Sequence, residues 1–277
     1  MPEARRPTLI AVGISPLEED EDTIALRHPL DTAATRDLVD VLNGHARGTS
    51  VLIARPAWAD HESMRRLRMA CAAAQHGRVA VLTTSLPPLA AQVLLWQGRE
   101  LLDHAPAGWV HAALDALEQR YSACAVLSNI RGLRHPNPRF GQHVASIVPG
   151  TGFVATTHPA PSLRRVRPDV PLKLPEPPAP SGAVIAEAAG GAERMRDTVL
   201  RELGGETVQG EPDTGGAAFW GTSRYTEIVR YPMLTADRLT QLQAAIRPRR
   251  CGWCGGWAGA SSCPYCAMVL DGTGRVA

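Results

Sequence analysis

The chain has 277 residues, a formal net charge of +2, and a composition that is 44% hydrophobic and 20% charged. This is a globular composition, which excludes collagen-like, coiled-coil and wholly disordered chains. The near balance of basic and acidic residues also argues against a protein that uses its whole surface to bind duplex nucleic acid.

The N-terminal segment has a short apolar run broken by Gly and Pro, with no small-residue cleavage site after it. This pattern is not that of a signal peptide. No apolar run reaches the roughly 18 residues that a membrane helix needs. The preference for Arg over Lys and the abundance of Ala, Gly and Pro are typical of GC-rich bacterial genomes. Because the cysteines do not suggest a secreted disulfide framework either, we expect a cytoplasmic bacterial protein without a membrane partner.

Strands and helices alternate over the first 130 residues. The sequence predicts strands at 7–14, 49–56, 78–84 and 122–129, and helices at 31–43, 60–77, 85–102 and 107–120. The strands are near-continuous apolar runs, which favours a parallel sheet covered on both faces. The predicted fold class is therefore α/β, with an open, mostly parallel, flavodoxin/Rossmann-like sheet.

Residues 143–158 predict a hairpin around a Pro-Gly-Thr-Gly turn, added at the sheet edge, and complete a predicted α/β domain of residues 1–158. The Pro-rich segment 159–181 predicts a linker or a strap. Residues 182–246 predict a small α+β module, with strands at 183–186 and 224–231, helices at 192–203 and 235–246, and a Gly-rich loop at 204–218.

The C-terminal segment 247–270 contains two CxxC pairs, formed by Cys251 with Cys254 and by Cys263 with Cys266. Two residues between paired cysteines let both thiolates turn onto one ion, so two pairs complete a tetrahedral site. The arrangement is similar to the zinc ribbons of otherwise unrelated proteins, which implies a structural zinc ion. Iron in the same four-thiolate site, or two disulfides, are the alternatives.

Arginines and aromatic residues surround these cysteines. They are Arg247, Arg249, Arg250, Trp253, Trp257 and Tyr265. Such a group could stack on the bases of a single strand, dock on a protein partner, or pack back on residues 182–246.

A second candidate site lies where the predicted parallel strands end, since ligands of open α/β sheets bind at the carboxyl ends of the strands. Free N–H groups and hydroxyls could hold a phosphate or carboxylate there, with an arginine to neutralise it. The candidate residues are Arg55, Thr83, Thr84, Ser85 and Arg131. Ser85 also fits an ordinary helix N-cap, and the usual phosphate-binding fingerprints GxGxxG and GxxxxGK[ST] are absent from the expected places.

The leading hypothesis from the sequence is an adaptor or scaffold protein that binds another macromolecule through its zinc ribbon. One alternative is a nucleic-acid-associated protein that uses the arginines and aromatics of the ribbon. Another is an α/β enzyme acting on a phosphorylated or carboxylate ligand at the carboxyl edge of the sheet. No catalytic constellation can be named, so the sequence leans against an enzyme, and a small-molecule ligand stays unknown.

Overall fold

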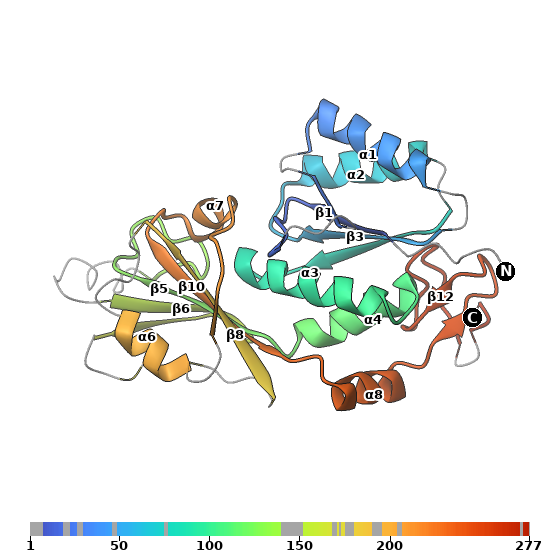
Figure 1. Ribbon diagram of the computed structural model, residues 1–277. Coiled ribbons are helices and arrows are strands. Elements are labelled where there is room, and N and C mark those ends of the chain that lie inside the picture. Colours follow the sequence, from blue (N-terminus) through green and yellow to red (C-terminus); the bar gives the residue numbers. More distant parts are fainter. Residues whose placement is uncertain are drawn as a thin grey trace. The chain divides into compact units, whose positions relative to one another are not determined.

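The computed structural model describes most of the chain (Figure 1). The described residues are 8–18, 23–26, 30–45, 49–74, 77–139, 152–167, 171, 173–174, 180–189, 196–203, 207–271 and 274–276. Most of the acidic run 18–22 and the first half of the predicted hairpin at 143–158 lie outside them.

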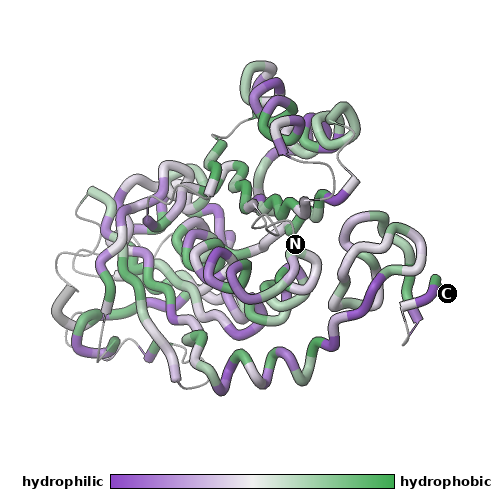
Figure 2. The backbone as a smooth tube through the Cα atoms, turned by 45° about the vertical axis from the view of Figure 1, so that its right-hand side comes forward, coloured by the Kyte–Doolittle hydropathy of each residue, from purple (hydrophilic) through white to green (hydrophobic). Residues whose placement is uncertain are grey.

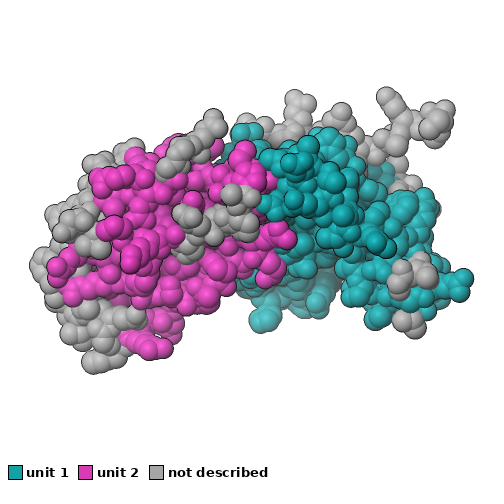
Figure 3. Space-filling view, turned by 90° about the horizontal axis from the view of Figure 1, so that it is seen from below, with its two compact units in different colours: residues 1–85, 94–118, 234–277 teal, residues 86–93, 119–233 magenta. Residues whose placement is uncertain are grey.

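The chain forms two compact units, shown in separate colours in Figure 3. The first unit contains residues 1–85, 94–118 and 234–277, and the second contains residues 86–93 and 119–233. The expected border at residue 158 falls inside the second unit. The physical reason is that the strand ending at His158 pairs with strands on both of its sides.

The sheet of the first unit is parallel and has the strand order β2-β1-β3-β4. Helices α1 and α2 cover one face of this sheet, and α3 and α4 cover the other (Figure 1). The strands are β1 (Thr8–Val12), β2 (Thr23–Leu26), β3 (Val51–Pro56) and β4 (Val79–Thr84), and the helices are α1 (Thr32–Gly44), α2 (His61–Ala73), α3 (Pro88–Leu102) and α4 (Ala107–Glu118).

Local sequence explains where these helices begin. The Asp31 carboxylate accepts a hydrogen bond from the N–H of Ala34, and Asp60 does the same for Ser63, so each aspartate is the N-cap of its helix. Helix α3 begins at Pro88, three residues later than expected, because proline suits the first helical position, where its missing N–H costs nothing.

The sheet of the second unit has the order β7-β6-β5-β10-β8-β9, and its pairs are antiparallel except for β8 with β9. Its elements are β5 (Ser122–Leu127), β6 (Gly152–His158), β7 (Ser162–Val166), β8 (Ser181–Ala188), α6 (Arg196–Leu203), β9 (Thr207–Gln209), α7 (Gly216–Trp220) and β10 (Tyr225–Pro232).

This topology corrects the flavodoxin/Rossmann-like expectation while keeping a mixed α/β fold with a parallel sheet. The segment 122–127 is not the fourth strand of the parallel sheet but lies inside the antiparallel one. All six of its residues are buried. Its continuous apolar pattern therefore indicates burial on both faces of the sheet, and does not indicate whether the neighbouring strands are parallel or antiparallel. Likewise, β6 is an internal strand of the second sheet, and the predicted linker contains β7.

The chain returns to the first unit through α8 (Ala236–Ala245), which alternates hydrophilic and hydrophobic residues along its length (Figure 2). It leads into β11 (Arg249–Arg250) and β12 (Trp257–Ala258), which pair with each other. The indole N–H of Trp109 in α4 donates to the carbonyl of Ile246 at 2.7 Å, which fixes the end of α8 on α4. Among the described residues, no helix is long and apolar enough to span a membrane.

Candidate functional site

The start of α3 brings together some of the predicted anion-binding donors. The backbone N–H and the hydroxyl of Ser85 both donate to the same carboxylate oxygen of Glu118, at 2.8 and 2.6 Å. Glu118 is a buried residue of α4, so a carboxylate of the chain itself takes both donors. Thr84 is also buried, and Arg131 belongs to the other unit, where its backbone N–H donates to Asn129.

Arg55 and Thr83 occupy a different position, on the face of the parallel sheet that α2 covers. They are partners in the β3–β4 register, so their side chains point to the same face. The Arg55 side chain is buried, with Nε and Nη2 donating to the carbonyl of Pro56 at 3.1 and 2.7 Å. Its Nη1 is also buried and has no hydrogen-bond partner among the described residues.

A groove of about 310 Å³ lies beside these two residues, between α2 and β4. Strand β4 is the edge of its sheet, so the groove borders the open side of the strand. We call this the β4 groove; its lining residues are Met64, Leu67, Arg68, Cys71, Val81 and Thr83. Most of the lining is apolar, and Arg68 and Thr83 are exposed at it.

The charges around the β4 groove are mainly positive. Burial lowers the pKa of Arg55, the nearby Asp60 carboxylate opposes this shift, and the like charge of Arg68 adds to it. The two guanidinium groups are therefore close enough to repel each other, with one carboxylate beside them. Burial also raises the pKa of the Cys71 thiol to about 11, so this group is a neutral, apolar part of the groove at pH 7.

The second unit contains a buried carboxyl group that sequence reasoning missed. One oxygen of Glu227 accepts from the backbone N–H of Leu89 at 2.9 Å, and the other accepts from the indole N–H of Trp220 at 3.0 Å. Burial raises the pKa of Glu227 to about 8, although both hydrogen bonds oppose the shift. The only sequence signal was one glutamate inside an apolar strand, which does not identify its partners.

The four C-terminal cysteines lie together, with their sulfur atoms all within 4.8 Å of one another. Of the surrounding aromatics, Trp253 is 71% exposed, whereas Tyr265 packs close to Gly108 of α4. Arg250 lies over the ring of Trp257, at 4.9 Å from its centroid. Arg249 donates to the carbonyl of Asp271 at 2.7 Å.

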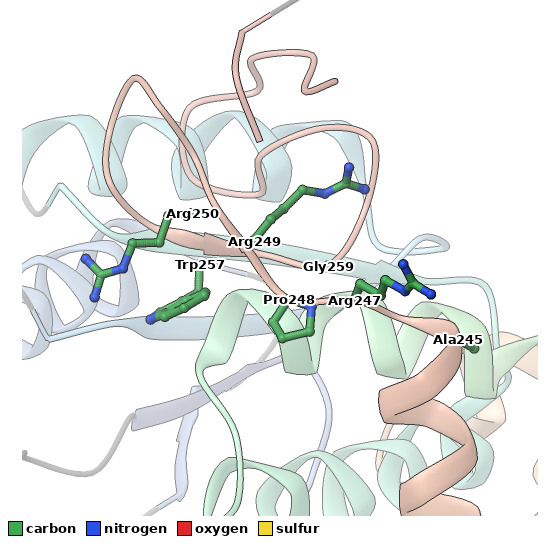
Figure 4. A pocket seen from close by; sticks show the side chains of 7 residues that line it. All are labelled: Ala245, Arg247, Pro248, Arg249, Arg250, Trp257 and Gly259. Carbon is green, nitrogen blue, oxygen red and sulfur yellow. The ribbon is translucent and has the colours of Figure 1, made fainter. Parts of the chain in front are cut away.

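Three arginines and Trp257 line a depression at the start of this segment, shown in Figure 4. The side chains of Arg249 and Arg250 point away from each other in this view, as expected for adjacent residues of a strand. Their guanidinium groups therefore do not converge on one point. The segment packs on α4 of its own unit, and its Gly259 also lies against Ile246, the last residue of the predicted module 182–246.

No protein-family model matches the chain, and no curated protein matches it. Among solved structures, the chain is similar to DegV family proteins. The match to the protein from Corynebacterium glutamicum has 14% identity and a TM-score of 0.57, and covers 84% of this chain and 99% of the other. A fatty-acid-binding DegV family protein from Thermus thermophilus matches with 14% identity and a TM-score of 0.57, over 82% and 100% of the two chains.

A third similar structure is a DegV family protein from Eubacterium eligens loaded with heptadecanoic acid. It matches with 11% identity and a TM-score of 0.53, over 82% of this chain and 100% of the other. At these identities the similarity concerns the fold. It places both units of the chain in a fold that the sequence analysis did not identify.

These neighbours overturn the functional hypothesis drawn from the sequence. An adaptor that recruits a protein partner, and a nucleic-acid-associated protein, were both inferred from the C-terminal segment alone. Over 82% of the chain, the fold is instead similar to that of proteins described with a fatty acid as a small-molecule ligand. The adaptor and nucleic-acid hypotheses are therefore wrong, and the enzyme alternative has no support in the comparisons.

Proposed function

We propose that this protein binds a long-chain fatty acid, with the acyl chain in the β4 groove and the carboxylate at the end lined by Arg68 and Thr83, next to the buried Arg55. The observation that carries the proposal is the fold, which is similar over more than four fifths of the chain to DegV family proteins that bind fatty acids. The groove supports the proposal from within the first unit.

The apolar part of the β4 groove suits an alkyl chain. Its volume of about 310 Å³ is at the lower end of the range for small-molecule sites, roughly 300 to 1,000 Å³. Transfer of each methylene group from water into such a site is worth about 0.8 kcal/mol. Affinity is therefore expected to rise with chain length by about fourfold per methylene, until the groove is filled.

The polar end of the groove suits a carboxylate. Arg55 has a buried Nη1 with no partner among the residues that the structure describes, and its register partner Thr83 contributes an exposed hydroxyl. Arg68 adds a second guanidinium, which leaves a net positive charge beside Asp60. A guanidinium pairs well with a carboxylate because its N–H groups match the two oxygens.

The test is displacement of a fluorescent polyene fatty acid from the delipidated protein by oleate and by methyl oleate. We expect oleate to compete and methyl oleate to compete poorly, because the ester has no charge. Arg68→Gln should weaken oleate binding about tenfold, the loss of roughly 1.4 kcal/mol. Arg65→Gln, a change of an exposed arginine of α2 outside the groove, is the matched control.

A second variant separates the function from its location. Thr83→Trp places a large side chain in the groove from an exposed position, so it should block the alkyl chain without disturbing the core. If no fatty acid of any length displaces the probe from the unmodified protein, the function is refuted. If oleate binds Thr83→Trp as tightly as the unmodified protein, fatty-acid binding stands and the β4 groove is not its site.

A further inference from the structure

We infer that Cys251, Cys254, Cys263 and Cys266 bind one Zn²⁺ ion, which holds the C-terminal segment on α4. This inference is independent of the proposed fatty-acid binding. The four sulfur atoms form one cluster with every pair within 4.8 Å, and all four cysteines are free. The structure thus brings together two CxxC pairs that are separated by eight residues in the sequence.

The spacing of the sulfur atoms fits a tetrahedral zinc site. Cys251 Sγ lies 3.7 Å from Cys266 Sγ, and Cys254 Sγ lies 3.5 Å from Cys263 Sγ. With Zn–S bonds of about 2.3 Å, neighbouring sulfurs of a tetrahedron are about 3.8 Å apart. Each of these contacts joins one CxxC pair to the other, so a single ion would link the two pairs.

The two CxxC pairs also have the same backbone conformation. Gly255 N–H donates to the carbonyl of Cys251, and Ala267 N–H donates to the carbonyl of Cys263, both at 2.9 Å. Gly255 and Ala267 each follow the second cysteine of a pair, and both have a positive φ, of 69° and 59°. Two separate turns of one geometry, facing each other, are the arrangement that closes a four-thiolate site.

Backbone N–H groups point at the sulfur atoms in both turns. Cys251 Sγ accepts from the N–H groups of Trp253 and Cys254. Cys263 Sγ accepts from the corresponding N–H groups of Tyr265 and Cys266. Such contacts orient the sulfur atoms, which is the role of hydrogen bonds around metal ligands.

The apolar core of this segment is small. Its two strands have two residues each, and its core consists of the four cysteines with Ala258, Tyr265 and Leu270. A segment this small does not bury enough apolar surface to fold alone, so a metal would supply most of its folding free energy. Since all four ligands come from the protein, no position is left for substrate, and the role of the ion is structural.

The contact with α4 shows what the ion holds in place. A Cβ atom added at Gly108 would lie 1.8 Å from the carbonyl oxygen of Trp257, so the segment touches the helix backbone directly. On the next turn, a Cβ added at Gly259 would lie 2.9 Å from Ala112 Cβ. Trp257 and Gly259 lie between the two CxxC pairs in the sequence, so an ion that joins the pairs would hold both contacts in place.

The experiment is elemental analysis of the purified full chain under reducing conditions, together with Cys263→Ser and Cys71→Ser. We expect about one zinc ion per chain in the unmodified protein and in Cys71→Ser, because Cys71 lies outside the cluster. Cys263→Ser should lose the zinc. Replacement of zinc by Co²⁺ should give the visible absorption bands of a tetrahedral four-thiolate site.

A second measurement avoids relying on a variant that fails to fold. Removal of the metal from the unmodified protein by a chelator should increase amide hydrogen exchange over residues 247–276, and added Zn²⁺ should restore protection. A protein that takes up neither Zn²⁺ nor Co²⁺ would overturn the inference. So would purified protein that contains iron, or one whose intact mass shows disulfides between these cysteines.

Discussion

The carboxylate of Glu227 accepts a hydrogen bond from the backbone N–H of Leu89, at 2.9 Å and 138 residues away in the sequence. Leu89 is in the first turn of α3, where N–H groups have no partner within the helix. Glu227 lies on β10, a central strand of the antiparallel sheet. Its carboxylate therefore provides an acceptor for a backbone N–H group at the start of α3. It does so while almost completely buried, at 1% exposure.

This burial predicts an unusual dependence of stability on pH. The pKa of Glu227 is raised to about 8 in the folded protein, from an ordinary value of 4.5. Between these values the folded protein holds a proton that the unfolded chain has released. The free energy of unfolding should thus fall as pH rises from about 4.5 to about 8, by up to about 1.4 kcal/mol per pH unit.

Urea unfolding at a series of pH values measures this slope. Glu227→Gln should remove most of it, at the cost of one hydrogen bond, because an amide cannot accept from both Leu89 and Trp220. Asp37→Asn, a change of an exposed carboxyl on α1, should leave the slope as it is. An unchanged slope in Glu227→Gln would show that another group causes the pH dependence.

The sequence predicted most elements of the fold but not their pairing. The predicted helix at 31–43 matches α1 to within one residue at each end, and the apolar runs located β1, β3, β4 and β5. Whether β5 pairs with β4 or with β10 depends on contacts between residues about 100 positions apart, such as Leu127 with Tyr225. A continuous apolar run is compatible with either partner, so the change of sheet after α4 left no local signal.

The candidate sites were also predictable to different degrees, because some depend on residues close in the sequence and others on residues far apart. The cysteine cluster could be predicted from the sequence, because two cysteines separated by two residues are brought close together by one short turn. The β4 groove exists because the side chains of α2 leave space above β4, and the hydrophobic periodicity of the sequence does not predict such a space. Ser85 was identified as a donor, but its acceptor Glu118 comes from another helix, 33 residues along the chain.

The pair of Ser85 and Glu118 gives a second prediction. Glu118→Ala removes the acceptor of both hydrogen bonds from Ser85, and because water can reach the exposed Ser85, the free energy of unfolding of the first unit should fall by about 1–2 kcal/mol. Ser85→Ala removes only the hydroxyl and should cost about 1 kcal/mol. In the double variant the two losses should not add, because the residues share one interaction. Additive losses in urea unfolding would contradict the hydrogen bonds.

The contact between α4 and the C-terminal segment gives a third prediction. Gly108→Ala should cost more than about 2 kcal/mol, because the new Cβ would collide with the Trp257 carbonyl. Gly44→Ala in α1 meets nothing within 4 Å and should be neutral or stabilise by up to about 1 kcal/mol. Similar effects of both changes on thermal unfolding would mean that the segment does not rest on Gly108.

Substitutions at the equivalent positions Gly255 and Ala267 should have opposite effects on the stability of the C-terminal segment. Both residues adopt a positive φ, which costs a residue with a Cβ about 1–2 kcal/mol relative to glycine. Ala267 is exposed, so Ala267→Gly removes this strain and loses little packing, and it should stabilise the C-terminal segment by about 1 kcal/mol. Gly255→Ala introduces the same strain and should destabilise the segment by a similar amount.

Amide hydrogen exchange over residues 247–276 measures both effects on the same segment, whether or not the rest of the chain unfolds with it. Slower exchange in Ala267→Gly and faster exchange in Gly255→Ala would agree with two turns of one geometry. The combined variant should exchange at close to the original rate, because the two changes lie in separate turns. Faster exchange in Ala267→Gly would contradict the left-handed conformation at that residue, since glycine would then only add freedom to the unfolded chain.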